Sequence, residues 1–399
     1  MFTIKGTYAT ATCYATQIDP AAVEQVRQML DQPFTEGQVV AIMPDAHAGK
    51  GCVIGTTMTV GDKAVPNVVG VDIGCGMLTV DIGKRAIDLP LLDEACHEVP
   101  SGFGVWEGRR ERFDLTRLRC HRQLKDTKRL ERSLGTLGGG NHFVEIDVDT
   151  NGGQHLVIHS GSRNLGTQVA SLYQNLAVEL HQGKEEYFAK RDTIIAEYKA
   201  AGRRKEIQAA LKQLAWSERE PDAPRELCWL YGSYLEDYLH DVAICQEFAR
   251  RNREVMAREI CGRAHLDPEG MFHTVHNYID VDEMILRKGA IAAHEGEVVL
   301  IPLNMRDGSV LARGRGNAQW NFSAPHGAGR VMSRTTAHET LSMDDYRQAM
   351  EGIYTTSVTE RTLDEAPAAY KSAADIMGPI EGAVDVLDVM RPIYNFKAQ

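Results

Sequence analysis

The sequence lacks the features of several special classes of protein. Its eight cysteines are spread widely and form no CxxC pair, which argues against a structural zinc ribbon and against a disulfide framework. No apolar run approaches the roughly 20 residues that a membrane-spanning helix needs. The N-terminus lacks the basic and then apolar layout of a signal peptide, so we expect a cytoplasmic location.

An excess of positive charge is also missing. The formal net charge is −11 over 399 residues, so contact with a nucleic acid would require a local basic surface. Arginines and lysines recur most densely at 109–132. This basic stretch fits two interpretations, a solvated helical face or a phosphate-binding surface.

The hydrophobic and charged fractions, 43% and 25%, are those of an ordinary globular protein with a large core. Segments with strand character precede and follow a mostly helical stretch at 164–262, and the tail at 336–399 also has helical character. This distribution predicts an α+β fold in which the helical stretch is an insertion between two β-rich halves. A further helix is expected at 20–31, with Pro20 in its first turn.

The glycine-rich segment 70–77 is the point around which we organise the chemistry. Valines precede it and apolar residues follow it, so the pattern predicts a strand, a tight bend and a second strand. Asp72 and Cys75 lie on the bend and can share one cation. Two ligands alone do not make a metal site, so the rest of the chain must supply others.

Further reactive side chains lie in predicted loops or at the ends of predicted strands. They are Asp45, His47, His142, His159, His276 and His326. A strand at 143–148 follows His142 and a strand at 155–159 ends with His159, so a hairpin would bring these two histidines close together. His276 falls within a predicted strand at 273–278.

Imidazole, thiolate and carboxylate ligands together suit a borderline divalent metal ion such as Zn, Mn, Fe or Co. The candidates exceed the needs of one tetrahedral site, so two ions that share a bridging ligand are plausible, as in many phosphoryl-transfer enzymes. The pattern predicts metal-dependent phosphoryl transfer or hydrolysis. Each histidine taken singly fits a structural role equally well.

A series of motifs, in this order, resembles the RtcB family of RNA ligases. The motifs are Pro44-Asp45-Ala46-His47-Ala48-Gly49-Lys50-Gly51, Gly70-Val71-Asp72-Ile73-Gly74-Cys75-Gly76-Met77, Gly138-Gly139-Gly140-Asn141-His142, His159-Ser160-Gly161-Ser162-Arg163, His276-Asn277, Arg287-Lys288-Gly289-Ala290 and Pro325-His326-Gly327-Ala328-Gly329-Arg330. The resemblance runs from about residue 40 to the C-terminus. It implies one catalytic domain over 1–399, with β-sheets sandwiched together and helices at the periphery.

The resemblance also implies an activity. Such a ligase joins RNA that ends in a 3′-phosphate or a 2′,3′-cyclic phosphate to RNA that begins with a 5′-hydroxyl, in RNA repair or tRNA splicing. Its cofactors would be GTP and two Mn²⁺ ions, its partner would be RNA, and no membrane partner is expected. His326 would attack GTP to form a histidine–GMP intermediate.

The same resemblance assigns residues to roles. Asp72, Cys75 and His142 would bind one Mn²⁺, and Cys75, His159 and His276 would bind the other. The positions that match nucleotide contacts are Asn141, His142, Glu145, Asn277, Pro302, Asn304, Met305, Ser309, His326, Gly327, Gly329 and Lys397. On chemical grounds, the carboxylate of Asp45 is expected to orient His326.

One turn departs from the family pattern. Where the family has Pro-Gly-Ser-Met-Gly, residues 302–306 are Pro-Leu-Asn-Met-Arg, which adds bulk at Leu303 and charge at Arg306. The departure keeps open the alternative of a metal-dependent cyclic phosphodiesterase that does not ligate. A further alternative is a non-catalytic protein that binds RNA ends, and the presence of every metal-ligand position and of His326 speaks against it.

Overall fold

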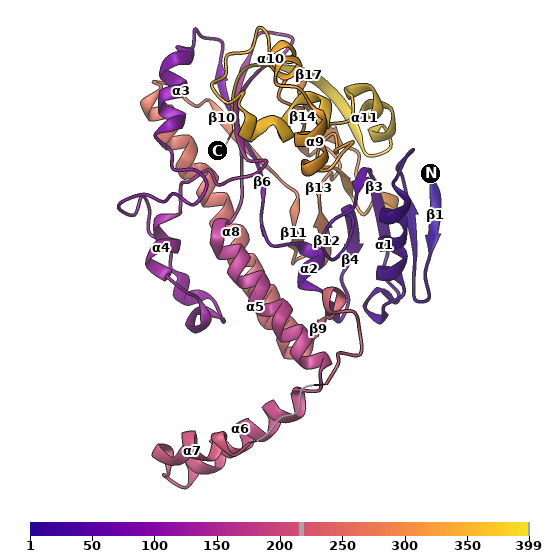
Figure 1. Cartoon of the computed structure of the whole chain (residues 1–399), viewed down its shortest axis with the longest axis vertical. Coiled ribbons are helices and arrows are strands. Elements are labelled where there is room, and N and C mark those ends of the chain that lie inside the picture. The colour runs from indigo at the N-terminus through magenta and orange to yellow at the C-terminus, as the bar shows by residue number, and fades with distance from the viewer. Residues whose placement is uncertain (215–218, 398–399) are drawn as a thin grey trace.

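The computed structural model describes residues 1–214 and 219–397 and has the predicted α+β architecture, with two large sheets surrounded by helices (Figure 1). The six-stranded sheet has the order β1 (Phe2–Lys5), β2 (Thr10–Cys13), β3 (Val40–His47), β4 (Ile54–Thr59), β12 (Ile285–Lys288) and β11 (Asn277–Asp280). The seven-stranded sheet has the order β10 (Gly270–Val275), β6 (Gly76–Gly83), β8 (Gln154–Ser160), β7 (Phe143–Val148), β17 (Val384–Lys397), β15 (Gly308–Gly314) and β14 (Val298–Asn304). Two short ladders pair β13 (Ala290–Ala292) with β16 (Ser323–Pro325), and β5 (Lys63–Ala64) with β9 (Leu230–Tyr231).

The register of the seven-stranded sheet brings its polar strand ends to one edge. Gly76 at the start of β6 pairs with Ser160 at the end of β8 and with Val275 at the end of β10. Phe143 at the start of β7 pairs with His159. Because these pairings are antiparallel, the residues next to them in sequence meet at the same end of four neighbouring strands.

His276 marks the point where the chain passes from one large sheet to the other. The predicted single strand at 273–278 is in fact two strands, β10 in the seven-stranded sheet and β11 in the six-stranded sheet. The backbone N–H of His276 donates to Cys75 O at 2.9 Å, and Gly74 N–H donates to Asn277 O at 2.6 Å. The bend before β6 therefore joins the two sheets.

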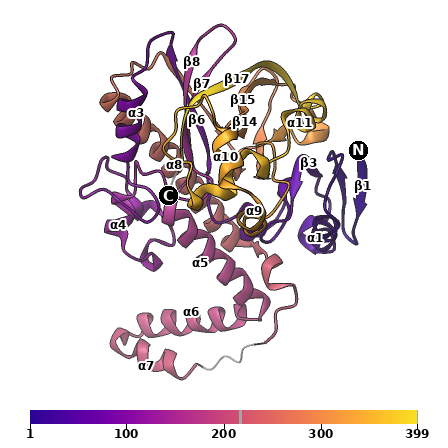
Figure 2. The same cartoon turned by 45° about the horizontal axis from the view of Figure 1, so that its top comes forward.

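Helices dominate the segment between β8 and β10, namely α5 (Arg163–His181), α6 (Glu185–Ala200), α7 (Ile207–Lys212) and α8 (Gly232–Arg263). Helices α5 and α8 pack beside each other against the sheets, and α6 and α7 project away from the rest (Figures 1 and 2). No residue within α6 or α7 is buried. Within the described residues, no helix combines the length and the apolar character that crossing a membrane requires.

Helix α1 (Pro20–Leu30) matches the prediction, with Asp19 as its N-cap and Pro20 in its first turn. The remaining helices are α2 (Pro66–Val69), α3 (Leu89–His97), α4 (Thr127–Arg132), α9 (Arg334–Thr340), α10 (Met343–Ala349) and α11 (Ala373–Ile380). The prediction of a strand just before the glycine bend is wrong. Helix α2 starts there at Pro66, and its residues Val68 and Val69 are buried.

The prediction of a helical tail over 336–399 is wrong for its last part. After α11 the chain forms the long strand β17, which pairs with β15 on one side and β7 on the other. The loop predicted at 44–51 also begins too early, because strand β3 continues to His47. Its pairing with β4 is irregular between Ile42 and His47, and this irregularity hides the strand from a pattern of alternation.

Some arginines of the basic stretch at 109–132 are paired with acidic side chains. Arg117 donates both guanidinium N–H groups to Glu247 of α8 at 2.7 and 3.2 Å. Arg109 pairs with Glu131 at 2.6 Å. Several other cations of the stretch are exposed and have no ion-pair partner among the described residues, so the contacts do not decide between the two interpretations.

Candidate active site

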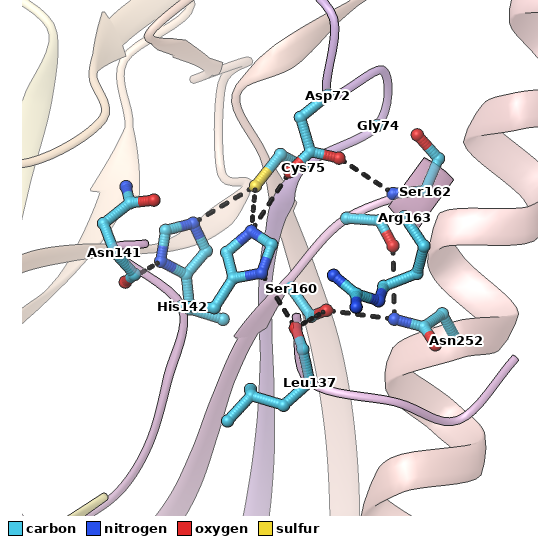
Figure 3. Close-up of polar contacts among 12 residues, drawn as sticks. Asp72, Gly74, Cys75, Leu137, Asn141, His142, Ser160, Ser162, Arg163 and Asn252 are labelled. Atoms are coloured by element: carbon cyan, nitrogen blue, oxygen red, sulfur yellow. Dashed lines mark hydrogen bonds and ion pairs between the residues drawn. The ribbon is translucent and has the colours of Figure 1, made fainter. Parts of the chain in front are cut away.

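Two groups of potential metal ligands share Cys75. One group is Asp72, Cys75 and His142, and the other is Cys75, His159 and His276; within each group the ligand atoms lie within 4.8 Å of one another. Cys75 Sγ is 3.4 Å from His142 Nε2 and 3.3 Å from His159 Nε2 (Figure 3). Ligand atoms bound at about 2.0–2.3 Å to one ion stand roughly 3–3.7 Å apart, so this spacing fits ligands of a common ion.

The backbone fixes which ring nitrogen of two histidines faces the cysteine. His142 Nδ1 lies 2.8 Å from Leu137 O, and His159 Nδ1 lies 3.1 Å from Asn141 O. A carbonyl oxygen only accepts, so each Nδ1 carries a proton and each Nε2 is the ring nitrogen that faces the cysteine. His276 Nε2 is 3.4 Å from His159 Nε2, and its buried Nδ1 has no hydrogen-bond partner among the described residues.

The electrostatics of the group suit a bound cation. Burial, followed by the charge of neighbouring His276, lowers the pKa of His159 well below its usual range. Burial also lowers the pKa of His276, so both imidazoles are neutral and able to ligate. Burial and then the Asp72 charge raise the pKa of Cys75 well above its usual range. A divalent cation is the charge that would favour the thiolate there.

Asp72 is ionised. Burial alone would raise the pKa of Asp72, but its hydrogen bond to His142 and the nearby positive charges outweigh burial and lower it. Asp72 Oδ2 is 3.1 Å from His142 Nε2, and Asp72 Oδ1 accepts from Ser162 N–H at 3.0 Å (Figure 3). These contacts aim the carboxylate at the shared cysteine.

A second polar pair joins His326 to Asp45. His326 Nδ1 lies 2.6 Å from Asp45 Oδ2, and Asp45 is completely buried at the irregular part of β3. The carboxylate accepts a hydrogen bond from Nδ1–H, and in the neutral ring this tautomer has its lone pair on His326 Nε2. Strand β16 ends at Pro325, opposite Ala290 of β13, and the His326 and His276 ring centroids are 5.0 Å apart. The pair therefore stands beside the metal-ligand groups.

His326 opens onto a cavity of about 350 Å³. Of the predicted nucleotide contacts, those that line it are Asn141, Glu145, Pro302, Asn304, Met305, His326, Gly327, Gly329 and Lys397. His142, Asn277 and Ser309 are not among its lining residues. His142 faces Cys75 instead, and the Asn277 side chain accepts from Gly289 N–H at 3.0 Å.

The divergent turn at 302–306 leaves the cavity open. Leu303 is buried in the apolar cluster of β14 and β15. Asn304 Oδ1 accepts from the N–H groups of Arg306 and Asp307, each at 3.0 Å, and so closes the turn. Arg306 pairs with Asp307 at 2.8 Å and does not line the cavity. The added charge is thus absorbed outside the cavity, whereas Leu303, although buried, is one of its lining residues.

Acidic side chains meet a lysine at the far end of the cavity. Lys397 Nζ donates to Glu365 Oε2 at 2.8 Å, and both groups are buried. Glu145 accepts from Asn395 Nδ2 at 2.5 Å. Burial, followed by the charge of Asp147, raises the pKa of Glu145 well above its usual range. Donors and acceptors are therefore available there for a polar ligand group.

Two residues of α8 that the sequence patterns did not single out hold the ligand-bearing loops together. Arg253 Nη1 donates to Gly74 O at 2.8 Å and to Ser160 O at 2.7 Å. Asn252 Nδ2 donates to Ser160 Oγ at 3.0 Å and to Gly161 O at 3.2 Å (Figure 3). Both residues continue the buried helical stripe that includes Ala249. Polar residues on an otherwise apolar stripe are the sequence feature by which these two could have been found.

Known proteins are similar in sequence to this chain over most of its length. A family model described as tRNA-splicing ligase RtcB matches residues 25–126 and 111–398. The RNA-splicing ligase RtcB of Escherichia coli (strain K12) is 29% identical, over 95% of this chain and 95% of that protein. The tRNA-splicing ligase RtcB of Aeropyrum pernix is 26% identical, over 88% of this chain and 86% of that protein. The resemblance of the motifs is thereby confirmed, and the chain belongs to the RtcB family of tRNA-splicing ligases.

Proposed function

We propose that this protein is a GTP-dependent RNA ligase that joins a 3′-phosphate or 2′,3′-cyclic phosphate end to a 5′-hydroxyl end. Its role would be in RNA splicing, as the names of its relatives suggest, or in RNA repair. The observation that carries the proposal is the His326–Asp45 pair beside ligand groups that share Cys75, with His159, His276 and His326 lining one cavity.

His326 is the proposed nucleophile. With its Nδ1 proton donated to Asp45, Nε2 attacks the α-phosphorus of GTP; a P–N bond forms and pyrophosphate leaves. GMP then passes from His326 to the RNA 3′-phosphate. The 5′-hydroxyl of the second RNA attacks that phosphate and releases GMP. A 2′,3′-cyclic phosphate first takes up water to give the 3′-phosphate.

The ligand groups fit two divalent ions, for which we propose Mn²⁺. Asp72, Cys75 and His142 would hold one ion, and Cys75, His159 and His276 the other. Such ions neutralise negative charge on phosphate groups. The same donor set also accepts Zn²⁺ or Co²⁺, so the choice of metal rests on the family resemblance.

The nucleotide would lie in the 350 Å³ cavity, with its α-phosphate next to His326. Gly327 and Gly329 line the cavity beside His326, and Gly329 also allows close packing on strand β3, since a Cβ there would come 2.6 Å from Asp45 O. Lys397 can donate to a base carbonyl, and Glu145 and Glu365 can accept from ring N–H groups. This combination is complementary to guanine, which supports GTP.

The decisive experiment measures transfer of label from α-labelled GTP to the protein with Mn²⁺ and without RNA. We expect acid-labile label on the wild-type protein and none on His326→Ala. His240→Ala, at an exposed position of α8, is the matched control and should label normally. Absence of label on the wild-type protein from GTP would contradict the proposal.

The Asp45→Asn variant tests the orienting carboxylate. It keeps an acceptor for His326 Nδ1 but loses the negative charge, so labelling should slow by about 10- to 100-fold. An unchanged rate would exclude this role for Asp45.

Joining of 3′-phosphate RNA to 5′-hydroxyl RNA then separates a ligase from a phosphodiesterase that only opens cyclic ends. The turn at 302–306 was the reason to consider the second activity. Arg306 pairs with Asp307 outside the cavity, whereas Leu303 lies in the apolar cluster and also lines the cavity, so the joining assay decides between the two activities.

A further inference from the structure

Phe103 is the most solvent-exposed large hydrophobic residue among those the structure describes, with 95% of its surface exposed. It lies between Gly102 and Gly104 in the irregular segment that follows α3. Neither the metal-ligand groups nor the nucleotide cavity uses it.

Backbone hydrogen bonds hold this exposed ring beside the glycine loop of the site. Gly102 N–H donates to Gly138 O at 2.6 Å, and Leu137 N–H donates to Pro100 O at 3.0 Å. The same glycine loop continues into Asn141, which lines the cavity, and into His142. Phe103 therefore has a fixed position at the edge of the active site.

The glycine loop next to Phe103 is open to water, as is one of the metal-ligand candidates. Asp72 is the one partly exposed ligand, with 31% of its side chain accessible, whereas the cysteine and histidine ligands are buried. Gly139, Gly140 and Asn141 are exposed as well. An RNA end that approaches the ligand groups along this exposed backbone passes Phe103.

Two arginine side chains contact the backbone next to the Phe103 ring. Arg129, an exposed residue of α4, donates from Nη2 to Phe103 O. Arg163 donates from Nη2 to Gly102 O at 2.6 Å. An exposed aromatic ring with guanidinium groups next to it is the arrangement by which proteins bind single-stranded RNA, because the ring stacks on a base and the cations contact phosphates.

We propose that Phe103 is a stacking platform for a base of single-stranded RNA next to the end that is joined, with Arg129 contacting the RNA backbone. The inference rests on the proposed ligase function, since it takes RNA as the substrate. It adds a determinant of RNA affinity outside the metal and nucleotide sites. Stacking is tolerant of base identity, so the platform selects a single-stranded end and not a sequence.

The test compares Phe103→Ala with Phe103→Trp and with Phe2→Ala, which removes an exposed phenylalanine at the outer edge of the six-stranded sheet. Binding of fluorescently labelled 3′-phosphate RNA and of 5′-hydroxyl RNA is measured without GTP. Each RNA is used with an intact and with an abasic terminal nucleotide. Phe103→Ala should weaken binding of one intact RNA by about 5- to 100-fold, whereas Phe103→Trp and Phe2→Ala should bind as the wild type does.

Binding of the abasic RNA decides whether the ring stacks on a base. If the ring stacks on a base, the wild type and Phe103→Ala bind the abasic RNA equally well. Equal affinities for the intact RNAs, or the same loss on intact and abasic RNA, would overturn the proposal. So would a concentration-dependent dimer of the wild type that Phe103→Ala abolishes, since the ring would then contact a second copy.

Labelling by GTP without RNA distinguishes this result from failure of the proposed function. Phe103→Ala should label at the wild-type rate, because the ring lies outside the nucleotide cavity. A wild-type protein that does not label contradicts the ligase, whereas normal labelling with unchanged RNA binding contradicts only the platform.

Discussion

Cys75 has the most demanding role of any single residue, because its sulfur belongs to both ligand groups. Cys75→Ala should therefore abolish binding of both metal ions, whereas His276→Ala removes a ligand from one ion and should retain about one ion per chain. Metal content after dialysis against Mn²⁺, measured by mass spectrometry, checks this. Cys96→Ala, which removes a buried thiol from another cluster, should keep both ions. Equal stoichiometry in Cys75→Ala and His276→Ala would argue against a bridging sulfur.

Asp147 makes stability depend on pH. It is completely buried, and burial raises its pKa from 3.8 to about 6. The folded state holds the proton more tightly than the unfolded chain does, so the free energy of unfolding falls as pH rises from about 4 to 6. Asp147→Asn should raise the free energy of unfolding at pH 8 by on the order of 2 kcal/mol, and the gain should shrink at pH 5.

Chemical denaturation at both pH values measures this effect, with Asp149→Asn as the contrasting control. Burial alone would raise the pKa of Asp149, but hydrogen bonds from Gly153 N–H and other groups outweigh it and lower it. That substitution should therefore destabilise the protein at pH 8. A gain for Asp147→Asn that is independent of pH would contradict the assigned cause.

At the residue scale, much of the site was predictable because its chemistry is local in sequence. Asp72 and Cys75 lie three residues apart, and each histidine stands at a strand end or in a loop. The approach of Asp45 to His326 was predicted from chemistry, and the structure places Asp45 Oδ2 at hydrogen-bonding distance. Asn252 was missed because its importance lies in contacts to residues more than 90 positions away, which no local pattern reveals.

At the scale of elements, α8 holds two loops of the site together through hydrogen bonds. Asn252 Oδ1 accepts from the N–H groups of Gly135 and Thr136 at 2.7 and 3.0 Å, while Nδ2 donates to the loop after β8. Asn252→Ala leaves these buried groups unpaired and should cost about 3 kcal/mol of unfolding free energy. Because the loops carry metal ligands, Mn²⁺ affinity should also fall, by about 10- to 100-fold.

Glu236→Ala, at an exposed position of the same helix, is the control and should change neither property. Denaturation and calorimetric metal titration measure the two effects. If Asn252→Ala lost stability but bound Mn²⁺ like the wild type, the residue would support the fold without positioning the ligands.

The elements themselves were less predictable than the site. Strand β17 was expected to be helical. That prediction is wrong because the segment pairs with β7 and β15, which are far away in the chain. The strand at 273–278 divides at His276 because the two sheets meet there. Both errors come from tertiary pairing, which overrides local propensity. The amphipathic helix α1, whose cap and stripe are local, was predicted correctly.

At the scale of the whole molecule, the negative net charge and the ion pairs of several arginines weaken long-range attraction of RNA. The chain has a net charge of −11, and Arg117, Arg251 and Arg258 are paired with acids. Arg112, Arg122, Lys125 and Lys128 are exposed and have no ion-pair partner in the described part of the chain. RNA binding should therefore involve few phosphate contacts and respond weakly to salt.

We expect the logarithm of the RNA association constant to fall with the logarithm of KCl concentration with a slope of about −2 to −3, since each phosphate contact with single-stranded RNA contributes about −0.7. Glu247→Gln frees Arg117, and Glu111→Gln frees Arg258 and leaves Arg251 with Glu254 alone, so both variants should steepen the slope. Glu186→Gln on α6 changes net charge equally but frees no arginine of this region, and should leave the slope unchanged. A steep slope in the wild type would mean that the basic stretch binds RNA despite its ion pairs, because the arginines would then have exchanged carboxylate partners for phosphates.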